Sequence, residues 1–149
     1  MKIRDSGMPD ESYWESLFNI PLILERFDIA RFHDVAELGC GYGTFTVPVA
    51  EAIRGTVYTF DVEPEMLART RARSAGLRVI CQLRDVMDSG FGVQADAVLL
   101  FNILHCEQPV ALLCHAAGQP LLDQVAVAPQ RVAGDDRECV VHPFNSTDS

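Results

Sequence analysis

The sequence predicts an α/β fold in which a mainly parallel sheet lies between two layers of helices. Four short apolar runs are expected to form strands, over residues 35–40, 56–61, 78–83 and 95–101. Helical stretches over residues 44–53 and 64–75 separate the first three of these runs, and a further helix is expected over residues 107–117, after the fourth run. Such alternation is typical of βαβ crossovers, in which consecutive strands run parallel and the connecting helices cover the faces of the sheet.

The length and charge of the chain limit the classes of protein it can belong to. A chain of 149 residues buries enough surface for one core, so we expect a single domain. Its net charge is −9, the wrong sign for electrostatic binding to nucleic acid. No apolar run approaches the roughly 20 residues of a membrane span, and the N-terminus lacks the apolar segment of a signal peptide. We therefore expect a cytoplasmic chain without a nucleic-acid or membrane partner.

The cysteine pattern predicts free thiols and no metal site. The five cysteines are an odd number and include no C-x-x-C pair. The pairs His105-Cys106 and Cys114-His115 contain zinc-ligand residue types, but the interval between them matches no common zinc spacing.

The N-terminal segment is expected to form two short helices. Ser12 and Glu15 have the spacing of a capping box at the start of the first helix. Pro21 suits the first turn of a second helix that is capped by Asn19 and ends near Phe27.

A glycine-rich loop is expected between the first strand and the first helix of the sheet. It reads Gly39-Cys40-Gly41-Tyr42-Gly43-Thr44. Glycine allows the positive φ of a tight turn and lets the backbone approach a ligand closely. An acidic residue, Asp61, ends the second strand, where a carboxylate can accept both hydroxyls of a ribose. The loop therefore indicates a nucleoside-containing ligand.

Two familiar nucleotide-binding motifs do not fit this loop. The dinucleotide fingerprint G-x-G-x-x-G needs glycine or alanine at the position of Thr44. A phosphate-binding P-loop needs a Gly-Lys-Ser/Thr sequence, and the one lysine of the chain is Lys2. A pyrophosphate ligand is therefore disfavoured.

The pattern Glu37-x-Gly39-x-Gly41-x-Gly43 resembles motif I of the class I S-adenosylmethionine-dependent methyltransferases. In family order, Asp61 matches the ribose-binding position, Asp85-Val86 the adenine-binding pair, and residues 96–105 motif IV. The resemblance covers roughly residues 30–117. Within the family, the sequence is most similar to the small-molecule methyltransferases of the ubiquinone-biosynthesis type. It implies the following cofactor-binding residues: Glu37, Gly39, Cys40, Gly41, Gly43, Asp61, Val62, Asp85, Val86 and Asn102.

This resemblance implies a Rossmann-like three-layer sandwich that transfers a methyl group from S-adenosylmethionine to a small-molecule acceptor. The charges agree with this cofactor, which carries a cationic sulfonium and an ammonium group. We expect Glu37, Asp61 and Asp85 to line the mouth of the site, where they would attract these cations and repel pyrophosphate.

Several candidate site residues also have a structural interpretation. Asp61 can instead cap the helix that begins at Pro64, and Asp85 can cap a turn. Asp96 starts its strand, at the opposite edge of the sheet, and is expected to be structural. Cys40 is expected to be a small buried filler within the loop.

His105 is a weak candidate for a catalytic base, and its alternative is a helix cap or a packing residue. Methyl transfer by in-line displacement often needs only proximity and orientation, so no base is obligatory. The aromatic residues Tyr13, Trp14 and Phe18 are candidates for a lid, as N-terminal helices form one in the family, but we favour a place in the core.

The C-terminal part of the sequence predicts little regular structure. The family resemblance implies seven strands, whereas only residues 124–128 offer a possible fifth, and little after Val132 is strand-like. We therefore expect a truncated or divergent end, and an exposed sheet edge that invites a homodimer. The single domain would comprise a helical cap (1–30), cofactor-binding βα units (31–117) and a divergent tail (118–149). Two other functions stay open: an inactive cofactor- or partner-binding module, and a nucleotide-dependent oxidoreductase.

Overall fold

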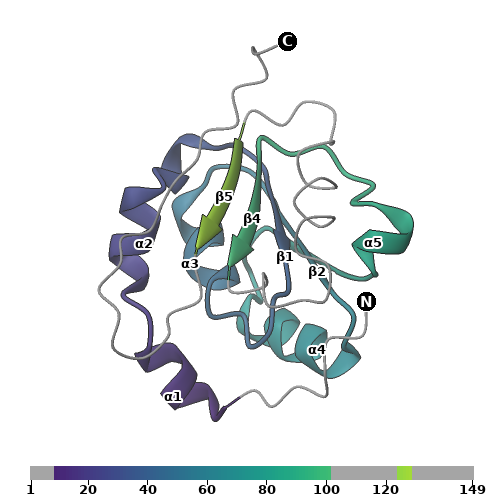
Figure 1. Ribbon diagram of the computed structural model, residues 1–149, viewed down its shortest axis with the longest axis horizontal. Helices are drawn as coiled ribbons and strands as arrows, with labels where there is room; N and C mark the ends of the chain where they lie inside the picture. Colours follow the sequence, from purple (N-terminus) through teal and green to yellow (C-terminus); the bar gives the residue numbers. More distant parts are fainter. Residues whose placement is uncertain (1–8, 102–123, 129–149) are drawn as a thin grey trace.

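The computed structural model describes residues 9–101 and the backbone of residues 124–128 (Figure 1). The helices are α1 (Glu11–Ser16), α2 (Ile20–Arg26), α3 (Thr46–Ala52), α4 (Pro64–Arg73) and α5 (Val86–Ser89), with a 3₁₀ turn η1 (Ile29–Arg31). The strands are β1 (Val35–Leu38), β2 (Val57–Asp61), β3 (Val79–Leu83), β4 (Ala97–Phe101) and β5 (Gln124–Ala128). None of the helices in these ranges has the length and apolar character needed to cross a membrane.

The five strands form one parallel sheet in the order β3-β2-β1-β4-β5 (Figure 1). The chain moves outward from β1 to β2 and β3, and then returns to place β4 on the other side of β1. The direction of winding therefore reverses between β1 and β4. In open α/β sheets the ligand lies outside the carboxyl ends of the strands at such a reversal, which is where the loop after β1 begins.

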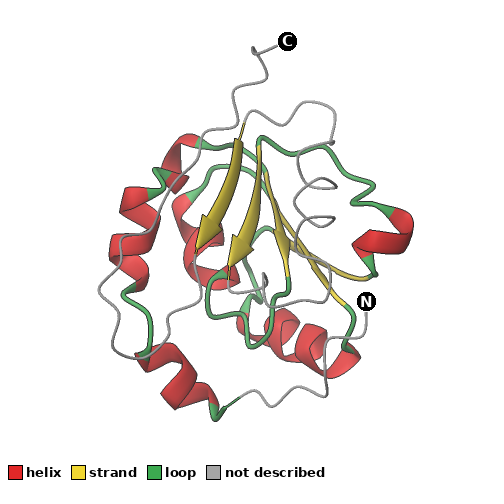
Figure 2. Cartoon of the chain, viewed as in Figure 1, coloured by secondary structure: helices red, strands yellow, loops and turns green. Residues whose placement is uncertain are grey.

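Alternate residues of the central strands face two separate apolar clusters, and helices cover both faces of the sheet (Figure 2). Val35 of β1 and Leu99 of β4 face the cluster that includes Val49 of α3. Ala36 and Leu100, their neighbours along the two strands, face the other cluster, which includes residues of α5 and of the loop after it. Burial on both faces explains why β4 is a continuous apolar run.

The predicted fold is confirmed. All four expected strands form within the predicted ranges, and residues 124–128 form a fifth strand parallel to β4. The helices predicted over residues 44–53 and 64–75 are present as α3 and α4, each slightly shorter. A helix over residues 107–117, and the expected lack of strands after Val132, lie outside the described residues.

The two N-terminal helices are also present, but the first begins differently from the prediction. Asn19 caps α2 as expected, because its Oδ1 accepts a hydrogen bond from Leu22 N at 3.3 Å. The capping box is wrong: the N-cap of α1 is Asp10, whose carboxylate accepts from Ser12 N at 3.0 Å. Because the helix begins at Glu11, Ser12 lies inside its first turn, and its Oγ donates to Asp10 Oδ1 at 2.6 Å.

A chain of aromatic rings joins α1 to the core. The rings of Trp14 and Phe18 lie 5.0 Å apart, Phe18 lies 5.0 Å from Phe45, and Phe45 lies 4.6 Å from Phe101. The core interpretation is therefore confirmed for Phe18. It is wrong for Tyr13, whose exposed fraction is 59%.

Asp96 has a structural role at the amino-terminal edge of the sheet, as expected. Its Oδ2 accepts from His33 N at 2.9 Å and from Asp34 N at 3.0 Å. Asp34 in turn accepts from Thr56 N at 2.7 Å, so these contacts join the starts of β1, β2 and β4.

Replacing Asp96 by alanine should lower the free energy of unfolding by about 1–3 kcal/mol, because two backbone donors lose their acceptor. Chemical denaturation measures this change. The control is Asp88→Ala on the exposed side of α5, which should change stability by less than about 0.5 kcal/mol. Equal stability of the two variants would contradict the role of Asp96.

Candidate functional site

The glycine loop, residues 39–44, joins β1 to α3 and depends on three residues with positive φ. These are Gly39 (φ 77°), Gly41 (φ 52°) and Gly43 (φ 79°), a region in which other residues are strained. Gly43 also has little space, because a Cβ there would lie 3.2 Å from Oγ1 of Thr70. The alternation of glycine along the loop therefore follows from its backbone conformation and its packing against α4.

Asp61, the last residue of β2, holds the loop from the neighbouring strand. Its Oδ2 accepts from Gly41 N at 3.2 Å and lies 3.5 Å from the thiol of Cys40, while its Oδ1 accepts from Glu63 N at 3.0 Å. The side chain is at the carboxyl edge, as predicted. Asp61 is not the N-cap residue of α4, which is Glu63, but its carboxylate accepts a hydrogen bond from the backbone of that residue.

Two side chains of α4 hold the carbonyl groups of the loop. Thr70 Oγ1 donates to Gly41 O at 3.1 Å, and Arg73 Nη1 donates to Tyr42 O at 2.9 Å. Neither residue was predicted from the sequence. Their spacing of three residues on a helix, which places them on one face, is the only signal that could have pointed to them.

Glu37 occupies a different position from the one predicted. Its side chain is 2% exposed and lies within the sheet, where its Oε2 accepts from Thr46 Oγ1 at 2.5 Å and from Thr59 Oγ1 at 2.9 Å. Burial raises the pKa of Glu37 to about 7, although the two hydroxyls oppose the shift. The expectation that Glu37 lines the mouth of the site is therefore wrong: it lies behind the loop and ties β1 to β2 and α3.

Cys40 is a buried thiol, in agreement with its interpretation as a filler. It is 5% exposed, and burial together with the negative charge of Asp61 raises the pKa of the thiol far above its usual range. A thiol held in the neutral form is a poor nucleophile and metal ligand. Its thiol contacts the Asp61 carboxylate at 3.5 Å.

Asp85 and Val86 follow β3 at the same edge of the sheet. Asp85 is the N-cap of α5 and accepts from Met87 N at 3.0 Å, so the capping alternative describes its local contact. Val86 is 1% exposed and packs into the core cluster beneath α5. A hydrogen bond from Arg84 N to Asp61 O, at 3.0 Å, joins this segment to the end of β2.

Three predicted site residues remain, and only one of them, Val62, lies within the described residues. Val62 follows Asp61 and is half-buried at the carboxyl edge. Asn102 and His105 lie outside the described residues. Within residues 9–101, no group of three or more His, Cys, Asp or Glu side chains is arranged to hold a metal ion.

The raised pKa of Glu37 makes stability depend on pH. Between pH 4.5 and about 7 the folded chain binds more protons at this residue than the unfolded chain, so rising pH destabilises the fold. Glu37→Gln removes this effect while keeping an acceptor for both threonines. The free energy of unfolding of the variant, relative to the natural chain, should rise by about 2–3 kcal/mol between pH 5 and 8.

Urea denaturation at several pH values measures this difference. Glu51→Gln, an exposed position on α3, is the matched control and should show a constant difference. Parallel stability curves for the natural chain and Glu37→Gln would contradict the assigned pKa.

Solved structures of methyltransferases have a fold similar to this one. The magnesium protoporphyrin IX methyltransferase of Synechocystis PCC 6803, with S-adenosylmethionine bound, is 23% identical, with 75% of this chain and 56% of that chain covered and a TM-score of 0.58. An S-adenosylmethionine-dependent O-methyltransferase of Thermotoga maritima is 20% identical, with 73% and 42% covered and a TM-score of 0.61. These similarities show a shared fold.

A further solved structure, the apo form of the S-adenosylmethionine-dependent methyltransferase SibL, is 28% identical, with 78% of this chain covered and a TM-score of 0.66. The chain spans 56% of the length of the Synechocystis enzyme and 36% of SibL. A search of curated protein sequences finds no significant relative. Residues 35–118, which include the glycine loop and the ends of β2 and β3, match the family described as a methyltransferase domain. The chain therefore belongs to the methyltransferase-domain family.

Proposed function

We propose that this chain binds S-adenosylmethionine at the glycine loop and transfers its methyl group to a small-molecule acceptor. The observation that carries the proposal is the position of the loop. It leaves β1 where the strand order reverses, and Asp61 of the adjacent strand is fixed beside it. Family membership and the methyltransferases of similar fold support the same cofactor.

The residues around the loop have the hydrogen-bonding capacity that this cofactor needs. The Asp61 carboxylate accepts from Gly41, Cys40 and Glu63, which leaves about one of its four lone-pair positions for a ribose hydroxyl. Glu37 would act from behind the loop, where its bonds to Thr46 and Thr59 fix the end of β1 from which the loop leaves. The charged acceptor Asp85 follows β3, where we assign the adenine amine.

The charge of these groups discriminates between cofactors. Asp61 and Asp85 favour a ligand with a sulfonium and an ammonium, and they oppose a pyrophosphate. Thr44, 3% exposed, fills the position at which a dinucleotide-binding loop has a small residue. The nucleotide-dependent oxidoreductase is therefore disfavoured.

The bound cofactor would supply an activated methyl group, and the chain would supply position and orientation. The glycine loop would hold the methionine part, and the carboxylates of Asp61 and Asp85 would hold the nucleoside. Fixing the donor in one orientation supplies much of the rate of an in-line displacement, so the mechanism needs no general base. His105 and Asn102 stay predicted site residues whose test is mutagenesis.

The finer predictions on partners and location are also proposals. The net charge of −9 supports a small-molecule acceptor in preference to nucleic acid. The cytoplasmic location stays a prediction. The solved methyltransferases of similar fold include O-methyltransferases, so an oxygen nucleophile is the acceptor to try first. Pairing of two copies through an outer strand of the sheet is tested by the mass of the chain in solution.

Calorimetric titration of the chain with S-adenosylhomocysteine tests the proposal, with NADH as the comparison ligand. We expect micromolar binding of S-adenosylhomocysteine and none of NADH. A folded chain that binds neither ligand, or binds only NADH, would contradict the proposal. Transfer of a labelled methyl group to hydroxyl-bearing acceptors then separates an enzyme from an inactive cofactor-binding module.

Asp61→Ala should weaken S-adenosylhomocysteine binding by about 1–3 kcal/mol, because the ribose loses a charged acceptor and the loop loses its bond to Gly41. Titration calorimetry measures the loss. Asp96→Ala is the matched control: it removes the same group at the opposite edge of the sheet and should lower stability without changing affinity. Unchanged affinity in Asp61→Ala would refute the assigned role.

A further inference from the structure

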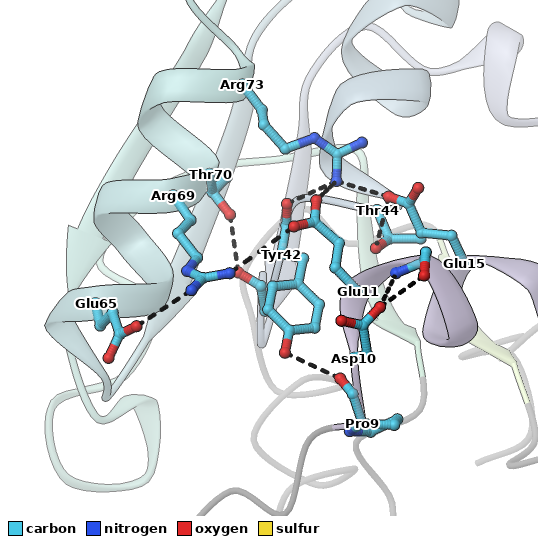
Figure 3. Close-up of polar contacts among 12 residues, drawn as sticks. Pro9, Asp10, Glu11, Glu15, Tyr42, Thr44, Glu65, Arg69, Thr70 and Arg73 are labelled. Carbon is cyan, nitrogen blue, oxygen red and sulfur yellow. Dashed lines mark hydrogen bonds and ion pairs between the residues drawn. The ribbon is translucent and has the colours of Figure 1, made fainter.

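One nitrogen of Arg73 lies at the meeting point of three structural elements (Figure 3). Nη1 of Arg73, at the end of α4, donates to Tyr42 O of the glycine loop at 2.9 Å. The same nitrogen is 3.0 Å from Glu11 Oε1 and 2.6 Å from Glu15 Oε1, both on α1. A guanidinium nitrogen has two hydrogens, so these three acceptors share its donors.

The N-terminal segment touches the loop at two further points (Figure 3). The hydroxyl of Tyr42 donates to Pro9 O at 3.0 Å, and Oγ1 of Thr44 lies 3.4 Å from the Glu15 carboxylate. Residues 9–15 therefore lie alongside the second half of the glycine loop, residues 42–44. Any movement of α1 away from the sheet breaks contacts with the backbone or side chains of that half.

Helix α1 depends on these contacts for its position. It has six residues and no fully buried side chain, and helices of this length do not persist alone in water. Among residues 9–101, its aromatic contact with the core runs through Trp14 and Phe18. The side chains of Arg73, Glu11 and Glu15 are 36%, 39% and 35% exposed, so each ion pair contributes about 0.2–1 kcal/mol and weakens with salt. The docked position of α1 is therefore readily reversible.

We propose that Arg73 is a positioning residue that couples the docking of α1 to the conformation of the glycine loop. When α1 is docked, Arg73 is held by two carboxylates and fixes the Tyr42 carbonyl. When α1 leaves, the arginine loses those anchors and the loop loses a bond. By linkage, a cofactor that needs the ordered loop must also favour docked α1. This inference rests on the proposed binding of S-adenosylmethionine at the loop.

The neighbouring arginine on the same helix face cannot replace this function. Arg69 lies 3.8 Å from Glu11, 3.5 Å from Glu65 and 5.3 Å from the ring of Tyr42, but no hydrogen bond joins it to a loop carbonyl. Arg73 alone among the described residues hydrogen-bonds both to α1 and to the loop backbone.

Hydrogen–deuterium exchange combined with calorimetry tests the coupling in the full chain. In the natural chain, S-adenosylhomocysteine should slow amide exchange over residues 11–16, which we do not place in contact with the ligand. In Arg73→Met, exchange there should be fast with or without ligand, and affinity should fall about three- to tenfold. Arg71→Met removes the same charge from the same helix without touching α1 or the loop, and should behave as the natural chain.

Salt supplies a readout that a purely structural role would not change. S-adenosylhomocysteine carries no net charge, so its direct contacts respond little to ionic strength. Raising the ionic strength from about 0.05 M to about 0.5 M should weaken its binding to the natural chain severalfold and leave Arg73→Met unaffected. The double variant Glu11→Gln/Glu15→Gln leaves α4 intact and should reproduce the loss, so the test does not depend on Arg73→Met folding well.

The outcomes separate the coupling from the cofactor assignment. If the natural chain binds S-adenosylhomocysteine, and the arginine and glutamate variants bind it equally well with the same protection of α1, the coupling is wrong and the proposed function stands. If the folded natural chain does not bind S-adenosylhomocysteine, the proposed function and the coupling both fail.

Discussion

The conformation of the glycine loop depends on hydrogen bonds that reach its backbone from other parts of the chain. Three glycines at positive φ allow the turn, but they do not select it, because glycine is free to take many other conformations. Selection comes from Asp61 on an amide of the loop, and from Thr70 and Arg73 on its carbonyls. The sheet sets the distance between β1 and β2, and hence whether Asp61 can reach the loop at all.

Behind this loop, the fold buries the carboxylate of Glu37 away from water. Glu37 is buried between β1, β2 and α3, and its pKa is raised to about 7 because two threonine hydroxyls only partly replace water. Such a group lowers stability when ionised unless a further donor is present. Glu37 therefore lowers the stability of the fold as pH rises toward its raised pKa, while it ties β1 to β2 and α3.

The sequence predicted the elements that depend on neighbouring residues. It did not predict the positions of side chains that depend on residues far away along the chain. Strand runs, the proline at the start of α4 and the alternating glycines are local signals, so the sheet and its loop were predicted. Glu37 was misplaced because its burial depends on Thr46 and Thr59, which reach it only after α3 and β2 have packed. The anchoring role of Arg73 could not be predicted either, since its acceptors lie about 30 or more residues away along the chain.

The central claim is that the carboxyl edge of the sheet around the glycine loop is a cofactor site. Amide NMR spectra of the chain, recorded during addition of S-adenosylhomocysteine, test this claim most directly. The account predicts that the largest shifts fall on residues 39–44, 61–63 and 85–87, with little change at Asp34, Thr56 and Asp96 on the opposite edge. Shifts concentrated on that opposite edge, or none in a folded chain, would contradict it.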